Sequence, residues 1–164
     1  MKRKPTTPLR LLWAALTAVT LVLLGGQAPA MASLPSDYSI TTSVILHGSS
    51  YSESYSRTIV IRNGRGEKVG DGEFRADPLN GSPGDALGAC DDLADGLGVE
   101  IRMDIGSSSG FYSTDRIAST RGRNSPTCTG WVTGDIAENT PVALKVCLVS
   151  GSLEYCSGVY YARA

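Results

Sequence analysis

Two closely spaced cysteines, Cys147 and Cys156, flank a turn signal near the end of the chain. Residues 142–149 and 153–162 are rich in strand-forming side chains, and Ser150-Gly151-Ser152 separates them. A Gly-Ser pair is typical of a two-residue type II′ hairpin turn. That turn places Cys147 opposite Cys156 at a non-hydrogen-bonded position, where Cα atoms lie about 4.5 Å apart and a disulfide fits. We therefore predict a β-hairpin closed by a Cys147–Cys156 disulfide.

The other two cysteines, Cys90 and Cys128, are then left to pair with each other. An even number of cysteines in an exported chain indicates disulfides. A zinc site is the alternative, but the chain has no C-x-x-C pair, and its only histidine, His47, lies far from the first cysteine. On the chain-entropy estimate the Cys90–Cys128 bridge contributes about 4 kcal/mol and the hairpin bridge about 3 kcal/mol.

Residues 1–32 have the pattern of a removable export signal. A basic start precedes an uncharged apolar run over residues 11–24, which is too short to span a bilayer. Ala30 and Ala32 form the A-x-A pattern that a signal peptidase recognises, so we expect cleavage after Ala32, with cleavage after Ala30 as the alternative. Residues 33–164 are then expected to form one secreted, extracellular domain that has no membrane contact.

The charge balance of this domain limits its partners. Lys2, Arg3, Lys4 and Arg10 leave with the signal, so the 16 acidic residues outnumber the basic residues that remain. This balance argues against nucleic acid as a partner. Arginine greatly outnumbers lysine in the expected domain, which is typical of a GC-rich bacterial genome.

Strand patterns dominate the domain. The clearest covers residues 99–105, in which apolar and charged residues alternate, so that we expect one buried and one solvated face. The other expected strands cover residues 38–47, 55–63, 68–75, 131–136, 142–149 and 153–162.

One α-helix is expected between two of these strands. Ser82 has the character of an N-cap, Pro83 suits the first helical position, and apolar residues recur at three- and four-residue steps up to about Gly96. The helix would place Asp91, Asp92 and Asp95 mainly on its outer face. We therefore predict a mainly β fold, a small antiparallel β-sandwich of about seven short strands, with one α-helix packed through its cysteine and two disulfides.

Three patterns have the form of catalytic or metal sites. Residues 106–110 fit G-x-S-x-G, but turn and strand residues follow where a nucleophile elbow needs a helix, so we interpret them as a loop. Any histidine-based mechanism would have to use His47, whose place at a strand end is typical of a structural residue. Residues 91–96 resemble the start of a calcium loop but lack its ligand at position three. We expect neither a metal nor a cofactor.

The segment from Gly88 to Ala94, Gly-Ala-Cys-Asp-Asp-Leu-Ala, resembles the cysteine-bearing helix of subtilisin-inhibitor-like proteins. The resemblance implies a small exported inhibitor with two disulfides and a helix through Cys90. The chain departs from that family because Ile61 and Arg62 stand where the partner cysteine is expected, and because the C-terminal cysteines are too closely spaced. The sequence is therefore not assigned to the family.

The sequence combines two expected disulfides with no recognisable set of catalytic residues. This combination favours a non-enzymatic β-domain that binds an extracellular protein or glycan. The candidate binding residues are arginines and aromatics suited to a contact surface: Arg121, Arg123, Trp131, Tyr155 and Tyr160. The alternative is a secreted serine-protease inhibitor, in which the loop of residues 121–128 presents an arginine to a trypsin-like pocket. A second alternative is a carboxylate-dependent hydrolase, for which the 16 acids offer many pairs and the sequence selects none.

Overall fold

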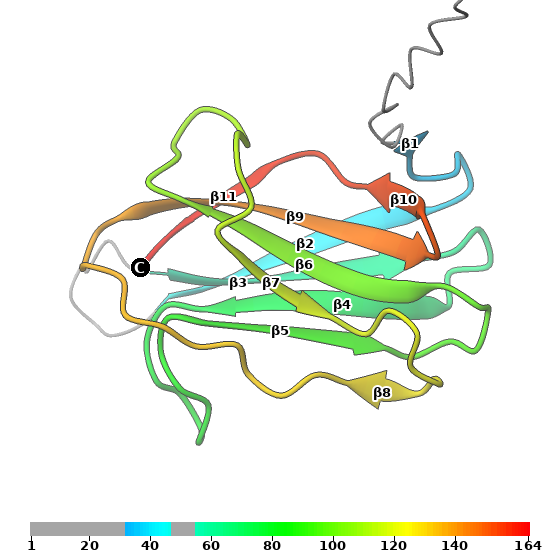
Figure 1. Cartoon of the computed structure of the whole chain (residues 1–164), viewed down its shortest axis with the longest axis horizontal. Helices are drawn as coiled ribbons and strands as arrows, with labels where there is room; N and C mark the ends of the chain where they lie inside the picture. Colours follow the sequence, from blue (N-terminus) through cyan, green and yellow to red (C-terminus); the bar gives the residue numbers. More distant parts are fainter. Residues whose placement is uncertain (1–31, 47–54) are drawn as a thin grey trace, which may run out of the picture.

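A computed structural model describes residues 32–46 and 55–164 (Figure 1). The described residues are mainly β and contain no helix, and hence none that could span a membrane. The strands, in chain order, are β1 (Ala32–Ser33), β2 (Ser39–Leu46), β3 (Tyr55–Arg62), β4 (Lys68–Arg75), β5 (Ala86–Asp91), β6 (Gly98–Ile105), β7 (Arg116–Ser119), β8 (Thr127–Cys128), β9 (Pro141–Ser150), β10 (Leu153–Cys156) and β11 (Tyr160–Arg163).

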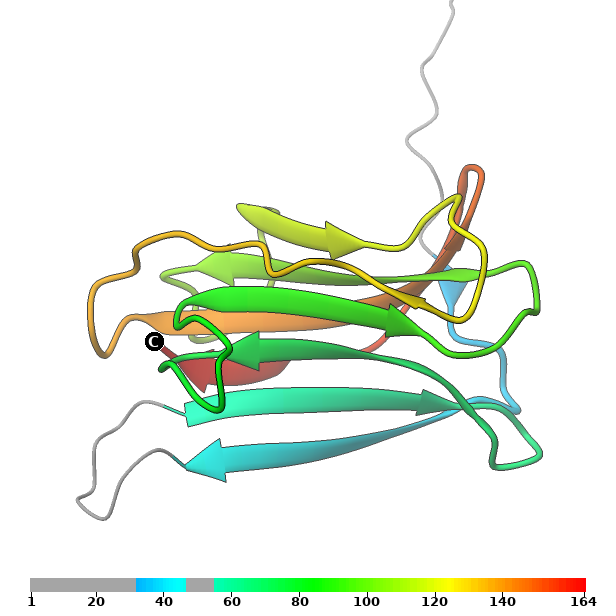
Figure 2. The ribbon, with the colours of Figure 1, turned by 90° about the horizontal axis from the view of Figure 1, so that it is seen from below.

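The strands form two antiparallel groups in a sandwich-like arrangement. One group runs β2–β3–β4–β5–β8, and in the other β9 pairs with β6 on one edge and with β10 and β11 on the other, while β7 extends β6. Figure 2 shows β2, in cyan, at the lower edge of the ribbon. The two groups meet at the pair Arg163 and Tyr55, and the short β1 is parallel to β10.

The two groups pack face to face without space for a side chain at Gly72 of β4. A Cβ atom there would lie 2.7 Å from a methyl carbon of Val146 on β9 and 2.8 Å from Ile101 on β6. The fully buried side chains around this contact include Phe74, Leu144 and Leu148. The core therefore lies between β4 on one side and β6 and β9 on the other.

The predicted helix over residues 82–96 is wrong. Residues Ala86–Asp91 form β5, which pairs with β4 on one edge and with β8 on the other. Its apolar residues fall on both faces of a short buried strand, and the same spacing also fits one face of a helix. Asp91, which was expected on the outer face of the helix, is buried. The helix implied by the resemblance to subtilisin-inhibitor-like proteins is likewise absent at Cys90.

The predicted strand over residues 131–136 is also wrong, because this segment makes only one isolated bridge, between Leu87 and Val132. The strand expected over residues 153–162 is divided into β10 and β11. Strand β7, by contrast, lies where no strand was predicted from the sequence. Its four residues are too few to show a period.

The C-terminal hairpin has the predicted register. Ser150 lies opposite Leu153 and Cys147 opposite Cys156, and Gly151 has a φ of 55° at the turn. The structure contains the Cys147–Cys156 disulfide across this hairpin, with a Cα–Cα distance of 4.0 Å. It also contains the Cys90–Cys128 disulfide, which joins β5 to β8.

Candidate binding site at one end of the domain

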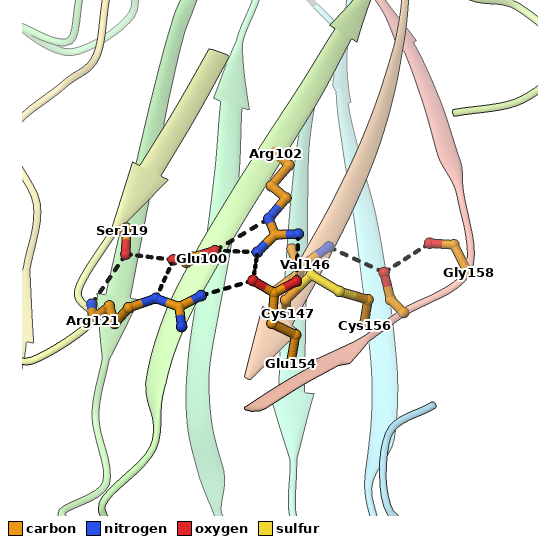
Figure 3. Close-up of a disulfide and its surroundings, with 10 residues drawn as sticks. Glu100, Arg102, Ser119, Arg121, Val146, Cys147, Glu154, Cys156 and Gly158 are labelled. Carbon is orange, nitrogen blue, oxygen red and sulfur yellow. Dashed lines mark hydrogen bonds and ion pairs between the residues drawn. A yellow bond between two sulfur atoms is a disulfide. The ribbon is translucent and has the colours of Figure 1, made fainter. Parts of the chain in front are cut away.

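Four charged side chains form a closed network beside the Cys147–Cys156 disulfide (Figure 3). Glu100 and Arg102 come from β6, Glu154 comes from β10, and Arg121 follows β7. The two β6 side chains belong to the face that the sequence predicted to be solvated, yet Glu100 is 3% and Arg102 is 7% exposed. That expectation is therefore wrong, and these charges are buried as partners of one another.

Each carboxylate of this network bridges both guanidinium groups. Glu100 accepts hydrogen bonds from Arg102 Nη2 at 2.6 Å and Nε at 3.1 Å, and from Arg121 Nε at 2.9 Å. Its fourth hydrogen bond comes from Ser119 Oγ at 2.9 Å. Glu154 accepts from Arg102 at 2.7 and 2.9 Å and from Arg121 at 3.0 Å. The pairing is nearly complete, which is what burial of charge requires.

The network holds both carboxylates in their ionised form. Burial alone would raise the pKa of Glu100, but hydrogen bonds from Arg121, Arg102 and Ser119 outweigh it and keep that pKa below its ordinary value. The hydrogen bond from Arg102 lowers the pKa of Glu154, against a smaller opposing effect of burial. Neither carboxylate thus has the raised pKa that a general acid needs.

Arg121 ties the network to the loop of residues 121–126 and to the hairpin turn. Its guanidinium donates a short hydrogen bond to the carbonyl oxygen of Gly151 in the β9–β10 turn. Its backbone N–H donates to Ser119 Oγ at 3.1 Å, and the N–H of Arg123 donates to the Thr120 carbonyl at 3.0 Å. The first half of the loop is therefore fastened through both side-chain and backbone groups.

The second half of the loop is fastened to β5. Ser125 Oγ donates a short hydrogen bond to the carboxylate of Asp91, and Cys128 is bonded to Cys90. Burial raises the pKa of Asp91 above its ordinary value, while the hydrogen bond from Ser125 opposes this rise. The loop thus leaves β7 and joins β8 with an anchor at each end.

A half-open pocket of about 520 Å³ lies against this loop. Three segments form its walls: the β5–β6 connection, the anchored loop and the β9–β10 turn. Its lining consists of Ala94 and residues 96–98, 121–125 and 149–151. Arg123 and Asn124 on this wall are exposed. The pocket and the two exposed side chains together make the loop end a candidate binding site.

The predicted site residues do not all lie together. Arg121 and Arg123 share the pocket wall. Trp131 lies over Gly88 of β5, where its ring is 3.0 Å from the position of an added Cβ. Tyr155 on β10 and Tyr160 on β11 are half-buried and pack against the core. The arginines therefore belong to one site, while each aromatic residue has a packing contact of its own.

Two of the other patterns singled out in the sequence lie within the described residues. Residues 106–110 lie in the loop between β6 and β7, where Ser107 Oγ donates to the Gly110 carbonyl at 2.9 Å. Asp92 forms an ion pair with Lys68 at 3.0 Å, and Asp95 accepts from the Leu97 N–H at 2.9 Å. Across residues 32–46 and 55–164, no group of three His, Cys, Asp or Glu residues is arranged to hold a metal ion. His47 lies outside the described residues.

Sequence reasoning missed Glu100 and Glu154 as parts of the site. A signal for the first was available, since Glu100 and Arg102 stand two residues apart and so share one face of a strand. Opposite charges on one face can pair with each other and become buried. No such signal was available for Glu154, because its contact with the network depends on how β10 lies relative to β6 and Arg121.

Comparison with known proteins adds nothing further, because no family model, curated protein or solved structure matches the chain.

Proposed function

We propose that the chain is an exported, non-enzymatic domain that binds another extracellular protein through the loop end described above. The observation that carries this proposal is the loop of residues 121–126, anchored at both ends, which presents Arg123 and Asn124 beside the 520 Å³ pocket. A fastened loop loses little conformational freedom on binding, so more of its contact energy is available for affinity. Arginine is also enriched at the centres of protein interfaces.

A protein is favoured over a glycan because of where the aromatic residues lie. Trp131 packs on Gly88, and Tyr155 and Tyr160 pack against the core, so these three rings do not form the pocket wall. The hydrolase alternative gains no support from Glu100 and Glu154, since Arg102 and Arg121 neutralise both carboxylates.

The protein-binding proposal is tested by placing a photo-crosslinking residue at Asn124 and, as the matched control, at exposed Glu138 in the same secreted protein. Illumination in the producing organism's culture medium should give one saturable cross-linked protein from position 124 and none from position 138. Adding the same secreted protein without the photo-crosslinking residue should reduce the amount of that product. Equal, unsaturable labelling from both positions would reject the loop end as the binding surface.

Export remains part of the proposal, and β1 makes its test more informative. Ala32 pairs with Tyr155 and Ser33 with Cys156, so cleavage after Ala32 removes one of the two β1 residues, whereas cleavage after Ala30 keeps both. We expect cleavage after Ala32 from the A-x-A pattern. N-terminal sequencing of the secreted protein should begin at Ser33, and a protein that retains Met1 would contradict export by a cleaved signal.

A serine-protease inhibitor is the second candidate, and the anchored loop is the observation that favours it. The structure separates the two arginines considered for the protease pocket. Arg121 is held by Glu100 and Glu154, while Arg123 is exposed, with Nη1 3.4 Å from the Cys128 carbonyl oxygen. Arg123 is therefore the residue that a trypsin-like protease would engage.

Titration of trypsin with the secreted protein distinguishes the two candidates. An inhibitor should abolish trypsin activity at about one molecule per enzyme, and Arg123→Ala should remove that effect, since the charge it presents would be lost from the protease pocket. Arg65→Ala, at an exposed arginine on the β3–β4 turn, is the matched control and should still inhibit. Prompt cleavage after Arg123 with full trypsin activity would exclude inhibition of this enzyme and leave the binding proposal in place.

A further inference from the structure

Strand β2 has an open edge. Within residues 32–46 and 55–164, β2 pairs with β3 alone, along all eight of its residues. Thr41, Thr42 and Ser43 are exposed in succession, although their side chains alternate between the two faces of the strand. The outward-facing N–H and C=O groups of such a strand can form a ladder with another strand.

The other edges of the described sheet are short or covered. The outer edge of β5 is occupied by β8 and by Thr129, whose N–H donates to the Ala89 carbonyl at 2.8 Å. Strand β7 has only four residues and carries a charge at Arg116, and β1 covers part of β10. Among the described strands with one paired neighbour, β2 is the longest.

The devices that normally protect a sheet edge are missing from β2. Its sequence, Ser-Ile-Thr-Thr-Ser-Val-Ile-Leu, contains no charge, proline or glycine. Its pairing with β3 is regular, whereas the irregularity near Arg62 lies between β3 and β4. Thr, Ile and Val also have high strand propensity. A strand of this kind is suited to pair with a further strand.

We propose that two copies of this chain associate through β2, with the two strands antiparallel about a two-fold axis and the two sheets continuous. A two-fold pairing centred on Thr42 aligns Ser39 to Ile45 of one copy with the same residues of the other, reversed. Opposite residues then share a face of the sheet, and Thr41 lies opposite Ser43, a favourable cross-strand pair.

The distribution of charge favours a second copy as the occupant. The nearest charged residues in the sheet, Arg57 and Arg62, lie on β3, one strand behind the edge. In the paired sheet the arginines of the two copies would be separated by three strand spacings, about 14 Å. That separation exceeds the screening length of about 8 Å at physiological salt. An uncharged edge therefore meets its own copy without repulsion.

The test is sedimentation equilibrium of the secreted protein. A single strand pair is a small interface, so we expect the weight-average mass to rise from monomer toward dimer between about 10 μM and about 1 mM. Thr42→Lys, which places two lysines at the two-fold axis, should remain monomeric over this range. Thr133→Lys introduces the same charge at an exposed position away from β2 and should associate like the wild type.

Amide hydrogen exchange supplies a second readout that does not depend on mass. Concentrating the wild-type protein should slow exchange at alternate amides of β2, and Thr42→Lys should show no such change. Equal melting temperatures of the two lysine variants would show that folding is intact. A wild-type protein that stays monomeric at 1 mM overturns the proposal, even where a different protein protects its β2 amides from exchange. So does a dimer that Thr42→Lys leaves undiminished.

Discussion

Glu100 provides the sharpest test of how the candidate site is built. Glu100→Gln preserves the shape of the side chain but removes its charge and turns one acceptor into a donor. The amide oxygen can still accept from Arg102, whereas the amide N–H₂ then faces the donors of Arg121 and Ser119. We expect a loss of about 3 kcal/mol in the free energy of unfolding, at the lower end of the range for breaking a buried pair because Arg121 is partly exposed.

Urea unfolding and thermal melting measure this loss directly. A change of about 3 kcal/mol corresponds to a fall in Tm of roughly 10 °C for a domain of this size. Glu138→Gln, at an exposed glutamate, is the matched control and should change stability by less than about 0.5 kcal/mol. A loss below about 1 kcal/mol for Glu100→Gln would refute the view that this network holds the loop end together.

The pH dependence of stability gives an independent check that Glu100 and Glu154 are ionised in the folded protein. Because the pKa values of Glu100 and Glu154 are lowered in the folded protein, their stabilisation is fully present above the ordinary glutamate pKa of about 4.3. It is lost as the pH falls through the lowered values. The stability difference between wild type and Glu100→Gln should therefore shrink below about pH 4. A difference that grows in acid would contradict the assignment of these groups as ionised partners.

Three further changes test the packing and the anchors. Gly72→Ala should destabilise the protein by several kcal/mol in urea unfolding, because the added methyl group would lie 2.7 Å from a β9 side chain across the core. The control, Gly130→Ala, has open space around it and should be nearly neutral in the same assay. Asp91→Asn should stabilise the protein at pH 7 and not at pH 3, because burial raises the pKa of this carboxyl and penalises its charge only where it is ionised. Replacing Cys90 and Cys128 together by alanine should cost about 4 kcal/mol in the same assay, and peptide mapping should show faster trypsin cleavage in the loop.

The parts of the fold that the sequence predicted depend on local geometry. The turn at Gly151 determines which residues face each other a few positions away, so the register and the Cys147–Cys156 pair follow from the sequence near the turn. The alternation over residues 99–105 similarly identified β6. In both cases the information is contained within one hairpin or one strand.

The errors arise where distant segments decide the outcome. The apolar residues of Ala86–Asp91 fit either period. The choice of a strand depends on β4 and β8, which flank this segment, and on Trp131, which lies over Gly88. The burial of Glu100 likewise depends on Glu154 and Arg121, which approach from other parts of the chain. Neither contact can be read from the spacing within one segment.

The anchors of the pocket walls are linked to one another rather than independent. The Cys147–Cys156 disulfide closes the hairpin whose turn contains Gly151, and Arg121 connects that turn to the anchored loop. The Cys90–Cys128 disulfide fastens the far end of the same loop to β5. Movement of the Arg123 wall relative to the turn would therefore require breaking the contacts that Arg121 makes with Glu100, Glu154 and the turn. Loss of Glu100 should consequently loosen the loop while both disulfides stay closed, so trypsin should cut after Arg121 or Arg123 faster in Glu100→Gln than in Glu138→Gln. Equal cleavage rates would mean that the disulfides alone hold the loop.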